Sequence, residues 1–146
     1  MQLNTFVNRL YDFLNNRKVF LIYIPLAIYW SLIFIATSIP IDEIPHVFKF
    51  QDKVEHFTAY FLLAILISFT LHFQEKYITL KKRFFFFSLL ILIFYGAIDE
   101  IHQMFIPGRI ADIYDWLADV IGGSFGIVLS YFVIMLGQKN KLQNIS

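Results

Sequence analysis

The chain has 146 residues, of which 58% are hydrophobic and 18 are phenylalanine, and its mean hydropathy is +0.64. A globular core of this length could not bury so much apolar surface, so the composition indicates an integral membrane protein, with membrane lipids and no nucleic acid as partners. The absence of cysteine excludes disulfides, thiol catalysis and thiolate metal sites, and the net charge of +1 is informative only through its distribution.

Residues 1–18 place apolar side chains at helical spacing, opposite asparagine, arginine and aspartate. This pattern predicts a short amphipathic helix that lies in the membrane interface. A cleavable signal peptide is the competing interpretation. We disfavour it because the apolar run starts late and ends in ATSIP, without a convincing small-x-small cleavage site.

Four windows are long and apolar enough to cross a bilayer as helices, which needs about 20 residues each. They cover about 19–39, 56–73, 84–105 and 113–136, and they are separated by Pro40, Pro45, Pro107 and Gly108. The predicted fold is therefore all-α, a four-helix transmembrane bundle in one membrane domain over 19–138. A polar tail over 139–146 is expected to be frayed.

Basic residues are unevenly divided between the two ends of the predicted bundle. Nine of the twelve lie in the N-terminal segment, in the loop between spans two and three, or in the tail, which predicts that both termini are cytoplasmic. Nine of the eleven acids and three of the four histidines lie in the opposite, outer half. The loops at 40–55 and 106–112 are expected to face outward at the cell membrane.

Ionisable side chains in the outer half follow helical spacing. An ionised group near the bilayer centre costs about 2.5–3.5 kcal/mol on insertion scales, so such groups usually face a bundle interior and have partners. Three polar stripes are predicted, one on each of spans two, three and four. They are Asp52, His56 and Tyr60; Glu100 and Gln103, or Asp99, His102 and Gln103; and Asp112, Asp115 and Asp119.

A purely structural interpretation competes for some of these residues. Asp112 would cap the start of span four, where a helix N-terminus favours negative charge, and Lys53 or Arg109 would neutralise nearby acids. His46 and His72 are expected to be interfacial side chains without chemistry. The convergence of polar stripes from three helices favours a functional site for a larger set of residues taken together. This set is Asp52, His56, Glu100, Gln103, Arg109 and Asp115.

Small residues recur every four positions along span four, at Ala118, Gly122, Gly126 and Ser130. Such a stripe lets another helix approach closely. We expect it to pack against span one or two of the same chain. Homodimerisation through Gly122 and Gly126 is the alternative.

Several motifs together resemble the VanZ-like family of small bacterial membrane proteins, over about residues 20–135. They are Thr37, Ser38 and Pro40; DKVEHFTAYFLL, with Asp52, Lys53, His56 and Tyr60; DEIHQMFIPGR, with Glu100, Gln103, Pro107 and Arg109; and DIYDWLADVIGGSFG, with Asp115, Gly122 and Gly126. Asp119 departs from the pattern, where we expect asparagine in many relatives. The resemblance implies a cell-envelope role, since the family is named after a teicoplanin-resistance protein, but it implies neither a reaction nor resistance.

Two functional hypotheses follow. In the first, the outer cluster binds or acts on an anionic envelope lipid or a glycopeptide-related ligand. His56 or Glu100 is then the general acid or base, and Asp52, one turn away, orients His56. The ligand-binding residues are Lys53, Tyr60, Gln103, Arg109, Asp115 and Asp119.

A variant of this hypothesis has Mg²⁺ or Mn²⁺ held by Asp52, Glu100, Asp115 and Asp119, although no spacing here is a metal signature, so no metal or cofactor is assigned. In the second hypothesis, the protein is a non-catalytic accessory or interaction protein. Its charged cluster is then a salt-bridge network around Arg109 that fixes helix register. A transporter is disfavoured because spans two and three carry almost no polar groups toward the cytoplasmic side.

Overall fold

The computed structural model describes the backbone of residues 2–40 and 48–143 and the side chains of 6–40 and 48–138. Within these residues every regular element is a helix. In chain order they are α1 (Gln2–Asn16), the π-helical turn η1 (Val19–Tyr23), α2 (Ile24–Thr37), α3 (Gln51–Phe73), α4 (Ile78–Lys82), α5 (Phe84–Gln103) and α6 (Ile113–Gln143). Pro45 and His46 lie outside the described residues.

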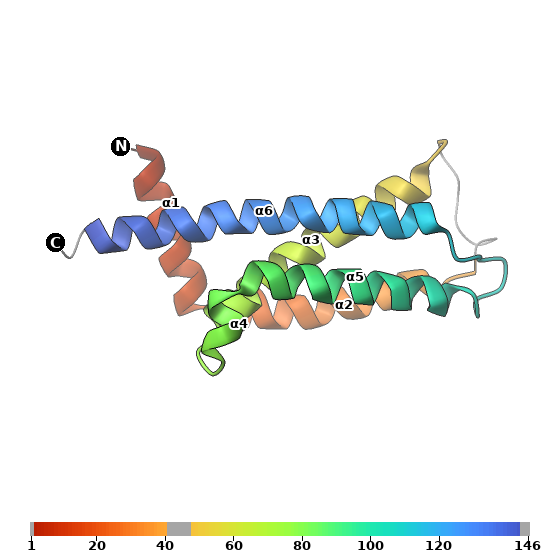
Figure 1. The fold of residues 1–146 in the computed structure, drawn as a ribbon, viewed down its shortest axis with the longest axis horizontal. Helices are drawn as coiled ribbons and strands as arrows, with labels where there is room; N and C mark the ends of the chain where they lie inside the picture. The colour runs from red at the N-terminus through yellow and green to blue at the C-terminus, as the bar shows by residue number, and fades with distance from the viewer. Residues whose placement is uncertain (1, 41–47, 144–146) are drawn as a thin grey trace.

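In the part of the chain that the structure describes, four helical segments are long and apolar enough to cross a membrane. They are Val19–Thr37, Gln51–Phe73, Phe84–Gln103 and Ile113–Gln138. The long helices run side by side, with α1, α4 and the last turns of α6 at one end and the loop between α5 and α6 at the other (Figure 1). The predicted all-α four-helix membrane bundle is confirmed.

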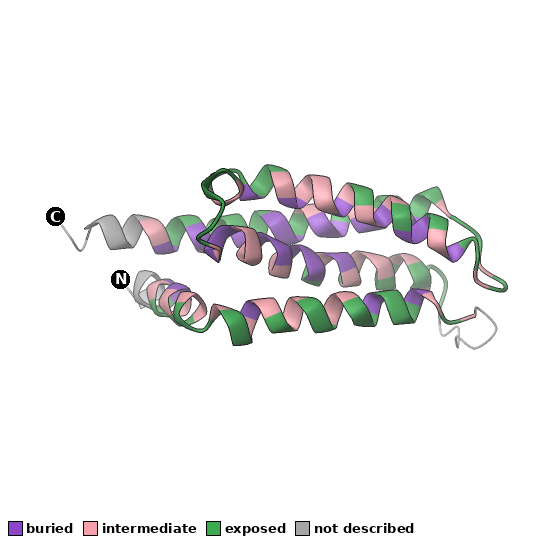
Figure 2. Ribbon diagram, turned by 90° about the horizontal axis from the view of Figure 1, so that it is seen from below, coloured by how far each residue is buried: buried purple, intermediate pink, exposed green. Residues whose placement is uncertain are grey.

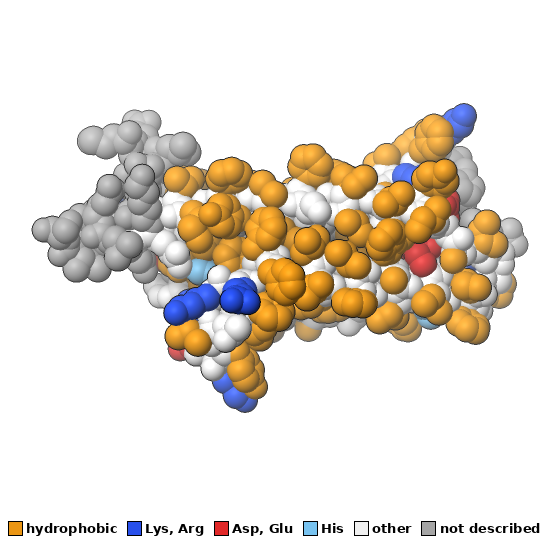
Figure 3. Space-filling model, viewed as in Figure 1, with side chains coloured by type: hydrophobic (Ala, Val, Ile, Leu, Met, Phe, Trp, Pro, Cys, Tyr) orange, Lys and Arg blue, Asp and Glu red, His pale blue; other side chains and the backbone are white. Residues whose placement is uncertain are grey.

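The charges separate along the long axis of this bundle. Figure 3 shows basic side chains around α4 and acidic side chains toward the opposite end, with hydrophobic side chains over most of the face between them. We call these the basic end, which carries α4, and the acidic end, which carries residues 106–112 and the first turns of α3 and α6. The apolar band between the ends suits the hydrocarbon region of a bilayer.

The first membrane span contains a proline, and the helix accommodates it with a π-helical turn. Pro25 has no N–H to donate and stands at the second residue of α2. The preceding turn widens, so that the N–H of Ile24 bonds to the carbonyl of Val19, five residues back. The span therefore continues across Pro25 as one helical segment, Val19–Thr37.

α3 and α6 form the closest helix pair, and glycines of α6 make this approach possible. A Cβ on Gly122 would lie 2.2 Å from the carbonyl oxygen of Phe57, and one on Gly126 would lie 2.3 Å from that of Phe61. The small-residue stripe therefore packs within the chain, as one of the two interpretations predicted. The α3 backbone thus covers both glycines within the chain.

The hydrophobic core lies where α3, α5 and α6 meet, with α2 on the periphery. Leu63, Leu92 and Ile127 are fully buried there, and purple segments face the interior in Figure 2. In contrast, only 11% of the Val19–Thr37 span is buried, against 28–39% for the other three spans. The first span is thus the least embedded of the four.

Two boundaries differ from the sequence prediction. α3 begins at Gln51, five residues before the predicted start of its span, after Phe50 adopts a left-handed conformation with φ 65°. Residues 51–55, mostly polar, thus form the start of the helix, and a hydropathy window does not detect them because it registers only apolar stretches. α6 continues to Gln143, so the expectation of a frayed tail is wrong for 139–143.

α1 packs across the basic end by burying its apolar face. Val7 and Tyr11 are 8% exposed, and the Tyr11 ring lies against Gly137 of α6. The Tyr11 hydroxyl and the Nε2 atom of His72 share a 3.1 Å hydrogen bond. His72 is only 2% exposed, so the expectation of an interfacial histidine is wrong: α1 covers it.

Candidate functional site

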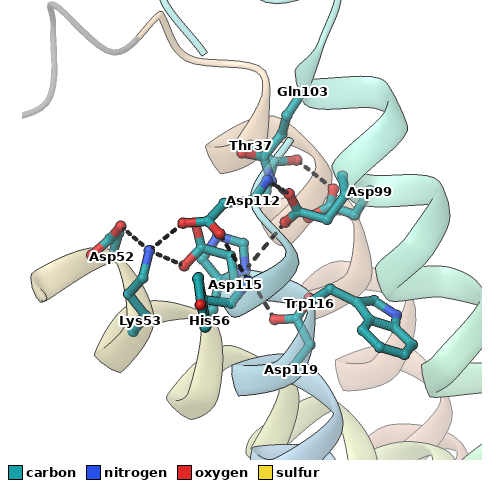
Figure 4. A network of polar contacts seen from close by, with 12 residues as sticks. Thr37, Asp52, Lys53, His56, Asp99, Gln103, Asp112, Asp115, Trp116 and Asp119 are labelled. Atoms are coloured by element: carbon teal, nitrogen blue, oxygen red, sulfur yellow. Dashed lines mark hydrogen bonds and ion pairs between the residues drawn. The ribbon is translucent and has the colours of Figure 1, made fainter. Parts of the chain in front are cut away.

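His56 of α3 stands at the centre of the acidic end, where helices α3, α5 and α6 converge (Figure 4). Its Nδ1 atom lies 2.9 Å from Oδ1 of Asp119 on α6 and 4.0 Å from Oε1 of Glu100 on α5. The imidazole side chain is 11% exposed. With Nδ1–H donating to the Asp119 carboxylate, Nε2 makes no hydrogen bond to any described residue.

Three buried carboxylates surround this histidine. Asp119 is 0%, Asp99 2% and Glu100 6% exposed. Glu100 accepts a 2.7 Å hydrogen bond from the backbone N–H of Asp112 through Oε2. Its Oε1 and the Oδ2 of Asp119 are buried and have no hydrogen-bond partner among the described residues. Buried oxygens without a hydrogen-bond partner are costly and are few in native proteins.

Asp99 is better satisfied than its neighbours. Its Oδ1 accepts a 2.9 Å hydrogen bond from the hydroxyl of Thr37 at the end of α2. Its Oδ2 accepts a 3.3 Å bond from the amide of Gln103, one turn further along α5. This carboxylate therefore ties the least embedded span to α5.

Lys53 gathers three further carboxylates at the outer rim of the acidic end. Its Nζ lies 2.7 Å from Oδ2 of Asp52, 2.7 Å from Oδ2 of Asp112 and 2.9 Å from Oδ1 of Asp115. Asp112 also accepts a hydrogen bond from the N–H of Tyr114, as the predicted cap of the fourth span would. The hydrogen bond from Lys53 and the cap together lower the pKa of Asp112.

Arg109 contacts carbonyl groups rather than carboxylates. It donates from Nε to the carbonyl of Ile39 at 2.8 Å and from a terminal nitrogen to that of Ala36 at 3.1 Å. A third bond, of 3.1 Å, reaches the side-chain oxygen of Gln103. The predicted salt-bridge network around Arg109 is therefore wrong within the described side chains. Arg109 instead caps the carbonyl end of the first span, where cations are favourable.

A cavity of about 280 Å³ opens beside these residues, between α2, α3 and α5. One part of its wall is apolar, and the other carries hydroxyl, imidazole, carboxylate and guanidinium groups. Tyr60 lies in the wall, 1% exposed and stacked on Tyr95 with ring centroids 5.8 Å apart. The polar side chains that line the cavity are Thr37, Glu55, His56, Tyr60, Asp99 and Arg109.

The predicted site residues fall into connected groups at the acidic end. His56, Glu100 and Asp119 form one cluster; Asp52, Lys53 and Asp115 belong to a second; Gln103 and Arg109 contact each other; and Tyr60 lines the cavity. The proposed orienting role of Asp52 is wrong, because its carboxylate points outward to Lys53 and is 49% exposed. Asp119 contacts His56 in its place.

Thr37 and Asp99 were not among the residues to which the sequence analysis gave a catalytic or binding role. Asp99 could have been chosen from its position inside the third span, four residues before Gln103 and on the same helix face. Nothing local marks Thr37 as its partner, because 62 residues separate the two.

Among the described side chains, two groups of three residues bring potential metal ligands within 4.8 Å of one another. One is His56, Glu100 and Asp119, and the other is Asp52, Asp112 and Asp115. The variant predicted from the sequence, with Asp52, Glu100, Asp115 and Asp119 on one ion, is wrong, since these residues are divided between the two groups.

Comparisons with known proteins give one match. A family model described as VanZ/LLP1 matches residues 7–135, which include three spans in full, most of the fourth, and both clusters at the acidic end. No curated protein and no solved structure matches the chain.

Proposed function

The chain belongs to the VanZ/LLP1 family, and we propose that it binds the anionic head group of a membrane lipid in the cavity at its acidic end. This proposal places the acidic end at the outer face of the cell membrane and both termini in the cytoplasm. The distribution of basic residues supports that orientation, because positively charged loops favour the cytoplasmic side.

The chemistry of the cavity wall carries the proposal. Ile33, Ala36 and Ala59 line it together with the polar groups of His56 and Arg109, so its two halves match the two halves of an amphiphile. The low burial of the first span supports entry from the bilayer between α2 and α3. A polyprenyl phosphate or a glycerolipid phosphate is the class of ligand that fits this description.

Arg109 would contact the phosphate of such a lipid. Three hydrogen bonds fix the guanidinium at the edge of the cavity and leave two of its five N–H donors for a ligand. Guanidinium groups bind phosphate oxygens through paired, charge-assisted hydrogen bonds. Thr37 lines the same cavity, although its hydroxyl already donates to Asp99.

In the metal-free site, His56 is the best candidate for a proton acceptor. Asp119 holds Nδ1–H, as the carboxylate of a catalytic triad holds its histidine, and His56 lines the cavity with Nε2 unbonded. Such a nitrogen would accept a proton from water or from a lipid hydroxyl. Glu100 provides a second ionisable group within 4.0 Å of the imidazole.

Native mass spectrometry of the detergent-purified chain tests lipid binding. We expect adducts with a polyprenyl phosphate or phosphatidylglycerol to survive release from the micelle, whereas phosphatidylcholine adducts do not. Arg109→Gln should weaken the anionic adducts at least about tenfold, the effect of losing about 1.4 kcal/mol of charge-assisted hydrogen bonding. Lys49→Gln, at the exposed rim of the same end, serves as the matched control.

The competing function is a non-catalytic accessory protein whose polar cluster is structural. The ion pairs of Lys53 favour it, since they join the start of α3 to the start of α6. Equal retention of anionic and zwitterionic lipids, with loss of folded protein in both Arg109→Gln and His56→Ala, would support the accessory protein and contradict the lipid site.

A further inference from the structure

Two buried carboxylate oxygens in the cluster of His56, Glu100 and Asp119 have no hydrogen-bond partner among the described residues. They are Oε1 of Glu100, in a side chain 8% exposed, and Oδ2 of Asp119, in a side chain 0% exposed. Oε1 of Glu100 points toward Nδ1 of His56 across 4.0 Å. A buried carboxylate oxygen without a donor or a cation is strongly destabilising, so this arrangement calls for a positive partner.

We infer that His56, Glu100 and Asp119 form a binding site for one divalent cation of the Mn²⁺ or Zn²⁺ class. The three residues come from α3, α5 and α6, so an ion held by them would join the three helices of the core.

The distances within the trio suit a shared ion. Ligands at about 2.1 Å from one metal lie roughly 3–3.5 Å from each other in tetrahedral or octahedral geometry. The Nδ1 atom of His56 is 2.9 Å from Oδ1 of Asp119 and 4.0 Å from Oε1 of Glu100. Small side-chain rotations, without backbone movement, would bring all three atoms to coordination distance.

The described side chains around His56 carry more potential negative charge than positive charge, which a bound cation would balance. Asp99, Glu100 and Asp119 are buried, and His56 is the cationic partner of Glu100 and Asp119, while His102 acts on Asp99. Arg109 donates to carbonyls and Gln103 instead. Two ionised carboxylates against a single imidazole would leave uncompensated buried charge. A divalent cation offsets it.

The second acidic group provides the contrast. Asp52, Asp112 and Asp115 also bring carboxylate oxygens together, but the ammonium of Lys53 stands among them, 2.7–2.9 Å from each. Lys53 already supplies the positive charge at that position. The rim cluster is therefore a built-in ion-pair network, and the cation site is the inner trio alone.

The donor set indicates which metals bind. Imidazole suits Zn²⁺ and other transition ions, whereas carboxylates suit Mg²⁺, Ca²⁺ and Mn²⁺. One imidazole with two carboxylates selects the overlap of these preferences. Three protein ligands leave open positions, and since His56 also lines the cavity, a water molecule or a phosphate oxygen would complete the shell from that side.

Metal binding changes the role of His56. With an ion bound, Nδ1 would be a ligand and the ring proton would lie on Nε2, so the imidazole could no longer accept a proton. Hydroxide formed from water on the ion would then be the proton acceptor. The ion site itself requires no lipid. It can therefore be tested separately from the lipid proposal.

Mn²⁺ titration of the EDTA-treated, detergent-purified full chain, followed by electron paramagnetic resonance, tests the inference. We expect one saturable Mn²⁺ site, displaced by Zn²⁺, with coupling to a single ¹⁴N nucleus. Glu100→Gln and Asp119→Asn should each weaken binding at least about tenfold, as loss of a charged ligand does. Asp52→Asn, which removes a carboxylate from the rim cluster, should leave binding unchanged.

Three results overturn the inference: no saturable Mn²⁺ site in the wild-type chain, a site without nitrogen coupling, or binding that persists in both inner variants. If the inner variants fail to fold, the wild-type titration and its nitrogen coupling decide alone. Arg109→Gln separates the two proposals, since it should lose lipid adducts while it keeps the Mn²⁺ site. Mn²⁺ binding without lipid adducts would contradict the lipid proposal only.

Discussion

At the scale of single residues, the contact between His56 and Asp119 should contribute measurably to stability. The Asp119 carboxylate is fully buried and makes a hydrogen bond with His56, 2.9 Å away. His56→Ala leaves that carboxylate without its partner, and removing one member of a buried pair costs about 3 kcal/mol or more. SDS-induced unfolding of the purified chain measures this loss.

A double-mutant cycle separates the pair from simple loss of packing. In the double variant His56→Leu with Asp119→Leu, neither member of the pair is left buried without the other. The double variant should therefore be more stable than the sum of the two single losses predicts. Strict additivity of the two single losses would contradict an energetic coupling between the residues.

The depressed pKa of Asp112 gives a prediction on pH. Because its hydrogen bonds with Lys53 and with the N–H of Tyr114 favour the ionised form, its folded pKa lies below the unfolded value of about 3.9. The stabilisation is therefore complete above that unfolded value and is lost as the pH falls through the folded pKa. Thermal unfolding of the wild type and Asp112→Asn should differ at pH 6 and converge toward pH 3. A constant difference would contradict the assignment.

At the scale of helices, the α3–α6 contact depends on the absence of side chains on α6. Gly122→Ala places a Cβ 2.2 Å from a backbone carbonyl of α3, which cannot move without shifting the helix. We expect a loss of about 2–3 kcal/mol in SDS-induced unfolding. The control is Gly123→Ala, whose Cβ would meet only the movable end of the Leu92 side chain, at 2.9 Å.

How much of each element could be predicted depends on the kind of signal. The four spans followed from hydropathy because about 20 apolar residues have one stable solution in a bilayer. The π-helical turn before Pro25 could not be predicted in this way, because hydropathy does not reflect that proline lacks a backbone N–H. The role of orienting His56 was wrongly assigned to Asp52 from its one-turn spacing. That spacing does not show that the Asp52 carboxylate turns instead to Lys53, with which it forms an ion pair.

At the scale of the whole molecule, the meeting of the polar stripes was predictable and the pairing within them was not. Membrane insertion forces ionised groups on several helices to face inward, so their convergence follows from sequence. Which carboxylate contacts which cation depends on helix rotation and height. Those are set by contacts between residues distant in sequence, such as Gly122 with the backbone of Phe57.

The orientation of the whole bundle in the membrane has a direct test, because the chain contains no cysteine. Ile110→Cys introduces a thiol at the acidic end, at a position 81% exposed, and Tyr77→Cys introduces one beside α4 at the basic end, at a position 53% exposed. If the positive-inside distribution determines topology, a membrane-impermeant maleimide added to intact cells should label the first variant and not the second. Permeabilised cells, in which both thiols should react, control for accessibility. Labelling of Tyr77→Cys alone in intact cells would place the cavity, His56 and the inner trio on the cytoplasmic side, where a lipid with an outward-facing head group could not reach them.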